Sequence, residues 1–352
     1  MSLVNDIIPG IDNFLPLLNP ALWLYIPNMK CNFKCAYCYV DRALNPRGTD
    51  DHPYNFKFPE NIKELKGWII LYGGEPLTDK KLLYRLILAI RRFTGEPIAI
   101  PTNGSLLSYK DVNFFKTYNV KLSISYDGEY QKYRGLDIFK DKRCSRVLYK
   151  AYKKGVIYGL NTVIHSKNFF NYKFDIPKFN VIHDYNYIYP IETGANKNFL
   201  LDASKADAVA NTVALNMKSL LTDLNAMSVK RLVLKYPPYL FTLLDSMLSL
   251  YCQKTVTPMD PNVPLCVQTN CVKLDIYGNK TCGKGRETKA DRSTPLGIEC
   301  ATCRYMPICS FKCPANKFDR SLCKESYAYK IYNKVDILLQ SALRNNFSQL
   351  SE

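Results

Sequence analysis

Three cysteines near the start of the chain have the spacing of a metal-binding loop. Cys31, Cys35 and Cys38 are separated by three and then two residues, directly after an apolar run from Leu22 to Ile26 that predicts a buried strand. A short loop with this spacing can bring its sulfurs around one centre, and soft thiolates select iron–sulfur clusters, zinc or copper(I). No fourth cysteine stands beside the three, so one metal position is left open. The loop predicts an iron–sulfur cluster; a zinc site completed from elsewhere, or three unconnected thiols, are the alternatives.

The cysteine loop resembles the signature of radical S-adenosylmethionine (SAM) enzymes. In that family three cysteines hold three irons of a four-iron cluster, and the amino and carboxylate groups of SAM chelate the fourth iron. Tyr37, just before the last cysteine, matches the aromatic residue of the family's pattern. The resemblance implies reductive cleavage of SAM to a 5′-deoxyadenosyl radical, which abstracts hydrogen from a substrate.

A second motif follows the next predicted strand. Gly73-Gly74-Glu75-Pro76 comes directly after the apolar run Trp68–Tyr72, at the carboxyl end where parallel-sheet proteins bind ligands. Glycines permit a close approach to the backbone, and a carboxylate can hold an ammonium group. Alone, these residues equally fit a plain strand-to-helix turn. Beside the cysteine loop they resemble the family's glycine-rich motif, which implies contact with the methionine amino group.

Two later strand ends carry further residues that resemble family positions. Asn103 lies in a Thr-Asn-Gly segment similar to one found in peptide-modifying members. Ser125 and Asp127 resemble a Ser-Ile-Asp-Gly segment near the SAM ribose. The inserted Tyr126 departs from that pattern, so either Ser123 or Ser125 is the contacting hydroxyl.

Two more residues are pocket candidates by position alone. Asn161 lies on the fifth predicted strand and Glu192 follows the sixth; ordinary turn residues are the alternative. The predicted SAM contacts are Tyr37, Gly73, Gly74, Glu75, Asn103, Ser123, Ser125, Asp127 and Asn161.

Alternating strand and helix patterns are expected to position these residues. Repeated units of this kind predict an α/β fold with a parallel sheet and right-handed crossovers. The pattern alone also allows a doubly wound sheet; the family resemblance implies a partial (β/α)6 TIM-like barrel. The predicted strands are Leu22–Pro27, Trp68–Tyr72, Ile98–Pro101, Val120–Ser125, Gly159–His165 and Tyr185–Glu192, and the predicted helices are Asp79–Phe93, Tyr109–Tyr118 and Asp141–Lys154.

A second group of eight cysteines lies in the C-terminal part of the chain. A zinc ribbon would use two Cys-x2-Cys pairs for four ligands, so eight thiols are too many for one such site. The spacing resembles the SPASM domain, a loop-rich module that carries auxiliary clusters in many radical SAM enzymes; paired zinc sites are the alternative. The resemblance implies one four-iron cluster on Cys266, Cys271, Cys282 and Cys313, and another on Cys300, Cys303, Cys309 and Cys323.

The chain divides into four predicted parts. Residues 1–200 form the barrel, 201–262 a helical bridge, 263–326 the SPASM domain and 327–352 a C-terminal helix. Within the bridge, Asp202 or Ser204 is expected to cap a helix. Cys144 falls on the apolar side of its helix, which predicts a core residue, and the three histidines, His52, His165 and His183, are not spaced as a triad or metal site.

Composition limits the class of protein. The chain has 352 residues, 47% hydrophobic and 22% charged, and lacks a membrane-length apolar run. Thirteen cysteines without a secretion signal predict metal ligation in a reducing cytoplasm. The net charge of +17 could favour an acidic partner or nucleic acid, but the basic residues along 142–154 are expected to face solvent on an outer helix.

The resemblance implies modification of a peptide or protein, because SPASM-bearing members most often act on peptides. The product could be a crosslink, a thioether, an epimer or an oxidised side chain. Gly283 follows Cys282 where sulfatase-maturing members place an aspartate, which disfavours that reaction. An electron donor such as flavodoxin or ferredoxin is expected. With 21 residues before Leu22, leader-peptide recognition, if the reaction needs it, is expected from a separate chain or from another surface. A radical enzyme for small molecules or nucleic acid, and a non-catalytic electron-transfer protein, are the alternatives.

Overall fold

The computed structural model describes nine stretches of the chain, which contain the first predicted motif and two cysteines of the second group. These are residues 6–11, 20–26, 30–38, 54–169, 179–187, 197–252, 273–278, 303–305 and 320–349. Among the described helices, none is long and apolar enough to cross a membrane.

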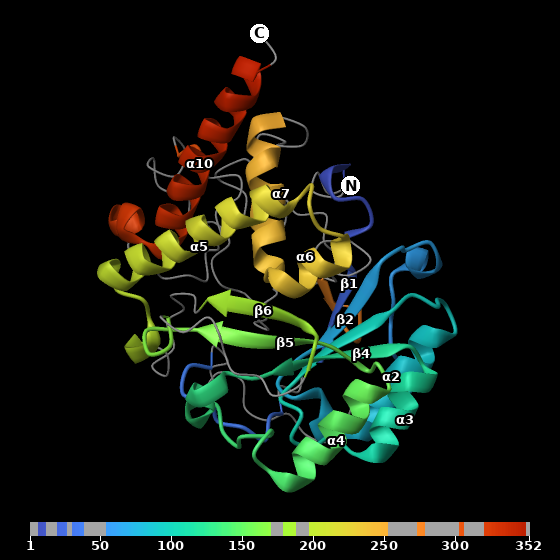
Figure 1. Cartoon of the computed structure of the whole chain (residues 1–352). Helices are drawn as coiled ribbons and strands as arrows, with labels where there is room; N and C mark the ends of the chain where they lie inside the picture. Colours follow the sequence, from blue (N-terminus) through green and yellow to red (C-terminus); the bar gives the residue numbers. More distant parts are fainter. Residues whose placement is uncertain are drawn as a thin grey trace.

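A parallel sheet of seven strands forms the centre of the described structure (Figure 1). Every neighbouring pair runs in the same direction, so all the carboxyl ends lie at one edge, which we call the carboxyl edge. Six strands follow one another across the sheet in sequence order, and the seventh pairs with the first. In spatial order the strands are β6 (Ile182–Tyr187), β5 (Ile157–Ile164), β4 (Val120–Ser125), β3 (Ile98–Thr102), β2 (Trp68–Tyr72), β1 (Pro20–Tyr25) and β7 (Lys273–Asp275).

Helices α2 (Lys80–Arg91), α3 (Tyr109–Thr117) and α4 (Lys142–Lys153) lie together along one face of the sheet (Figure 1). Each begins where a short polar side chain caps its free backbone N–H groups. Ser108 and Asp111 form a reciprocal capping box at the start of α3. The caps of α2 and α4 are Asp79 and Asp141.

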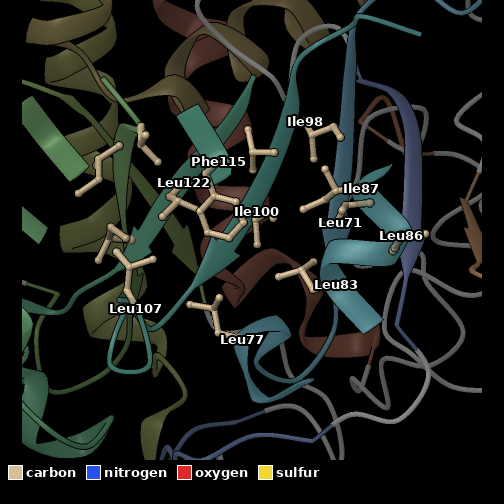
Figure 2. Close-up of a cluster of buried hydrophobic side chains, with 14 of the residues drawn as sticks. Leu71, Leu77, Leu83, Leu86, Ile87, Ile98, Ile100, Leu107, Phe115 and Leu122 are labelled. Carbon is tan, nitrogen blue, oxygen red and sulfur yellow. The ribbon is translucent and has the colours of Figure 1, made fainter. Parts of the chain in front are cut away.

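The main hydrophobic core fills the space between these helices and the sheet. Alternate strand residues such as Leu71, Ile100 and Leu122 meet helix residues such as Leu83 and Phe115 (Figure 2). Successive side chains of a strand point to opposite faces of the sheet. The strand residues that alternate with these core residues therefore point to the other face, which we call the inner face. The inner-face side chains are Trp23, Tyr25, Trp68, Ile70, Tyr72, Ala99, Ser123, Ser125, Tyr158 and Asn161.

A second core is built by the helices beside β6. It joins Ile8, Ile11, Ile164 and Ile182 to helices α5 (Ala203–Asp223), α6 (Val229–Lys235), α7 (Pro238–Cys252) and α10 (Tyr327–Gln349). Asp202 caps α5, as predicted, through a bond from the Lys205 backbone N–H.

The α/β class and the parallel sheet predicted from the sequence are confirmed, with one correction. The prediction placed six strands in the barrel, but β7 adds a seventh from within the segment assigned to the SPASM domain. β7 contacts β1 through Ile276 N–H, which bonds the Tyr25 carbonyl at 3.1 Å. β7 thus joins the sheet from the segment predicted to form the SPASM domain, and the division of the chain into four parts stays a prediction.

Candidate functional site

The cysteine loop lies at the carboxyl edge, directly after β1. Cys31, Cys35 and Cys38 are all partly exposed. Among the described residues, no three His, Cys, Asp or Glu side chains form a group that could hold one metal ion. A four-iron cluster needs thiolates that contact different irons, and the donor set fits it.

Hydrogen bonds fasten the loop to the ends of β2 and β3. Glu75 N–H donates to the Lys30 carbonyl at 2.6 Å. Asn32 donates to the Ser105 hydroxyl at 2.8 Å and accepts from the Asn103 amide at 2.9 Å. The start of the loop therefore cannot shift without breaking contacts to two neighbouring strands.

Glu75 is held in place by donors of the protein itself. Its carboxylate is buried and accepts from Leu77 N–H at 3.0 Å, the Thr102 hydroxyl at 2.7 Å and Asn103 N–H at 2.6 Å. Burial raises the pKa of Glu75, and these three donors oppose the rise. The carboxylate thus joins the ends of β2 and β3; contact with the SAM amino group stays a prediction.

Close packing explains Gly73. A Cβ there would lie 3.0 Å from the Ile26 carbonyl oxygen and 3.2 Å from the Ile26 Cβ. Glycine therefore allows β2 to leave the sheet against the end of β1. The two glycines, Ile26 and Glu75 line part of a small hollow at this edge, with Pro76, Thr78, Asp79 and Leu82 completing the lining.

Asp127 is buried at the end of β4, with no exposed surface. Its two carboxylate oxygens accept four hydrogen bonds: from the Tyr37 hydroxyl, from Arg134 Nε at 3.2 Å, from Arg134 Nη2 at 2.9 Å and from Val163 N–H at 3.1 Å. Two oxygens have about four acceptor sites, and all are filled. The geometry favours a structural role for Asp127 over the predicted ribose contact, which stays untested.

Tyr37 and Asn103 also have protein partners. The Tyr37 ring is buried between His165 and Phe199, with centroid distances of 5.2 and 5.7 Å. The Asn103 amide oxygen accepts from both Ser105 N–H and the Ser105 hydroxyl, at 2.9 and 2.7 Å. These two predicted SAM contacts hold the loop and the strand ends in place.

Ser125 and Asn161 fit a ligand contact better. They are register partners on β4 and β5, half-buried, on the inner face beside the carboxyl edge. Neither side chain hydrogen-bonds another described residue. Ser123, by contrast, hydrogen-bonds Tyr158 deeper on the same face. Of the two serines left open by the sequence, Ser125 has the hydroxyl without a partner among the described residues; which serine contacts SAM stays a prediction.

Sequence reasoning did not find Arg134 or His165. Both lie far along the chain from Tyr37, so no local spacing links them. His165 is buried at the end of β5, and its Nδ1 accepts from Lys167 N–H at 3.1 Å. Its Nε2 has no hydrogen-bond partner among the described residues, and burial lowers its pKa to about 4.

Several other predicted residues have a clear place. Cys144 is a buried core residue, as predicted. The basic residues of α4 face solvent on the outer layer, also as predicted: Lys142, Arg143, Arg146, Lys150 and Lys153 are exposed. Outside the described residues lie His52, Glu192, Cys266, Cys271, Cys282, Cys300, Cys309 and Cys313.

Two of the eight C-terminal cysteines are described. Cys303 is partly buried against the second core, and Cys323 lies in η8 (Arg320–Glu325), directly before α10. Beside Cys303, Arg304 and Tyr305 both bond the buried Asp336 carboxylate of α10, at 3.2 and 3.0 Å. The segments that carry these two thiols are therefore attached to the same helix.

Comparison with known proteins relates part of the chain to radical SAM enzymes. Residues 25–165 match the family model described as the Radical SAM superfamily. Radical SAM cyclopropyl synthase TigE of Paramaledivibacter caminithermalis is 26% identical over 185 residues, which cover 45% of this chain and 38% of that protein. The match thus spans well under half the length of this curated relative.

Solved structures share the fold over most of the chain. anSMEcpe with bound AdoMet and Cp18Cys peptide has a TM-score of 0.59 at 18% identity, covering 93% of this chain and 100% of that one. Streptococcus suis SuiB bound to S-adenosylmethionine has a TM-score of 0.51 at 15% identity, covering 87% and 75%. At these identities the likeness concerns the fold.

Proposed function

We propose that the protein is a radical SAM enzyme that modifies a peptide or protein. The observation that carries the proposal is the position of the cysteine loop. Its three thiols lie at the carboxyl edge of a parallel sheet, and other residues of the loop hydrogen-bond to the ends of β2, β3 and β4. Cys31, Cys35 and Cys38 would hold a four-iron cluster with one open iron. When bound, this cluster and SAM supply a 5′-deoxyadenosyl radical for hydrogen abstraction.

The chain's own residues orient SAM and exclude water. Ser125 and Asn161, whose side chains bond no other described residue, offer polar groups to SAM on the inner face. The backbone of Gly73 and Gly74 lies at the hollow beside Glu75. The aromatic side chains Trp23, Tyr25, Trp68, Tyr72 and Tyr158 make the remaining inner face apolar. A dry pocket protects a reactive radical from quenching.

A peptide substrate is supported by the fold neighbours. The anSMEcpe structure holds a peptide together with AdoMet, and it shares the fold over nearly the whole chain. The product type, the electron donor and any separate leader-binding protein are proposals from the family resemblance, as is a cytoplasmic location.

We further propose two auxiliary four-iron clusters on the eight C-terminal cysteines, grouped as the sequence implied. The attachment of the Cys303 and Cys323 segments to α10 supports a folded module at these positions. Three clusters predict about 12 irons per chain, whereas the first site alone predicts about 4. Zinc in place of the additional iron would contradict the auxiliary clusters.

Anaerobic reconstitution with iron and sulfide, then incubation with dithionite and SAM, tests the proposal. The parent should form 5′-deoxyadenosine, measured by mass spectrometry. Cys38→Ala should lose about four irons and all of this product, because it removes a ligand of the first cluster. Cys144→Ala, a buried cysteine away from the loop, is the matched control and should retain both. Equal product from Cys38→Ala and the parent would overturn the proposal.

Candidate peptides added to the same mixture test the substrate class. Loss of hydrogen from a peptide, or a new crosslink in it, would support the proposal. If no peptide stimulates SAM cleavage and an oligonucleotide or small molecule is modified instead, the substrate belongs to that other class.

A further inference from the structure

A buried ion pair lies directly behind the cysteine loop. Arg134 and Asp127 form a two-pronged pair, with Nη2 to Oδ1 at 2.9 Å and Nε to Oδ2 at 3.2 Å, and their side chains are 9% and 0% exposed. Burying two charges is costly unless both are paired and hydrogen-bonded. The proposed chemistry does not require this pair to touch SAM or substrate, so its place beside the loop needs another explanation.

The segment that carries Arg134 contacts the loop at three points. Ala36 N–H bonds the Tyr133 carbonyl at 2.8 Å. Gly135 lies so close to the Phe33 ring that a Cβ at this glycine would be 3.1 Å from it. The Arg134 guanidinium lies 5.5 Å from the centroid of the Tyr37 ring. Residues on both sides of Cys35 are therefore held against the ion pair.

The pair is fastened to the loop through its carboxylate. Asp127 accepts from the Tyr37 hydroxyl, and Tyr37 lies between Cys35 and Cys38 in the sequence. Both charges are buried, so solvent and salt screen their electrostatic effect on the loop less than they would at the surface.

We propose that Arg134 and Asp127 set the reduction potential of the iron–sulfur cluster held by Cys31, Cys35 and Cys38. Reduction adds one electron to a cluster that already carries thiolate charge, so a nearby guanidinium stabilises the reduced form and a carboxylate destabilises it. Net charge and hydrogen bonding around a cluster are known determinants of its potential. The inference rests on the proposed function, because that proposal supplies the cluster.

A redox titration monitored by electron paramagnetic resonance separates this role from a structural one. The full chain is reconstituted anaerobically. The paramagnetic signal that the parent shows and Cys38→Ala lacks is then recorded while dithionite lowers the potential. Arg134→Gln should shift the midpoint to a more negative potential, and Asp127→Asn to a more positive one. Arg134→Lys keeps the positive charge, so its midpoint potential should stay near that of the parent. A loop that is merely loosened would not give shifts of opposite sign.

Tyr37→Phe provides a milder variant should Asp127→Asn lose its cluster. It keeps the ring and removes one hydrogen-bond donor from Asp127. The carboxylate charge is then less compensated, so the midpoint should move to a more negative potential. Circular dichroism and iron counts accompany each variant. Equal midpoints in Arg134→Gln, Tyr37→Phe and the parent would overturn the inference while leaving the proposed function intact. A parent without the signal that depends on Cys38 would instead overturn the proposed function.

Discussion

At the scale of single residues, the predicted contacts divide into those used by the protein and those left for a ligand. Glu75, Asn103 and Asp127 were predicted to touch SAM, yet each is buried and bonded to other residues. Ser125 and Asn161 are half-buried and make no side-chain bond to a described residue. Polar residues at strand ends predict a site, but the sequence does not show which of them form hydrogen bonds within the protein itself.

Glu75→Gln tests the structural role of this carboxylate. All three partners of Glu75 are donors, so an amide NH2 must face at least one of them. We expect the free energy of unfolding to fall by about 1.5–3 kcal/mol, measured by urea denaturation. Glu64→Gln is the control: Glu64 is exposed, and its change should stay within about 0.5 kcal/mol. Equal stability of Glu75→Gln and the parent would show that the three hydrogen bonds contribute nothing.

At the scale of elements, the sequence predicted regular strands well and short ones poorly. The observed bounds of β2 and β4 equal the predicted Trp68–Tyr72 and Val120–Ser125, because each is an apolar or alternating run with clear breaks. β5 and β6 begin two and three residues earlier than predicted. β7 was missed because Lys273–Asp275 is only three residues long and has no run of apolar residues. Its pairing depends on β1, far away in the sequence.

The contact between the ends of β1 and β2 is tested by Gly73→Ala. The added Cβ would press on the Ile26 backbone oxygen, which is not free to move while Ile26 N–H bonds the Tyr72 carbonyl at 2.8 Å. We expect a loss of about 1–3 kcal/mol of stability, typical of overpacking. Gly95→Ala is the matched control, since a Cβ at Gly95 meets nothing within 4 Å. A thermal melt of both variants suffices; equal melting temperatures would contradict the close approach.

At the scale of the whole molecule, the described residues form two large hydrophobic cores. The first lies between the sheet and α2–α4, and the second joins the C-terminal helices to β6 and to Ile8 and Ile11. Binary patterning predicted the first core, because its residues alternate along strands or recur along helices. The partners of the second core come from opposite ends of the sequence, so pattern alone could not assign them.

Asp336→Ala tests how the second core is held together. Asp336 accepts from Tyr251 of α7 and from Arg304 and Tyr305 of the 303–305 segment. Its loss removes the shorter hydrogen bond of each tyrosine hydroxyl and leaves only acceptors at 3.4 Å, at an expected cost of about 1–3 kcal/mol. Hydrogen exchange should accelerate in α7 and α10 but not in β2–β4.

Asp207→Asn is the control for this experiment. Asp207 is half-exposed and pairs with Lys330 between α5 and α10, and an exposed ion pair contributes about 0–1 kcal/mol. Unchanged exchange in α7 and α10 of Asp336→Ala would show that the apolar contacts alone hold these helices together.

The position of β7 has a consequence for the synthesis of the protein on the ribosome. One edge of β1 pairs with β2 soon after both have emerged, but the other edge waits for Lys273–Asp275. At about 5–20 residues per second, that wait lasts on the order of tens of seconds. During this time the nascent chain presents an unpaired strand edge, which is a template for association with other chains. Completion of the described sheet is thus a late event in synthesis.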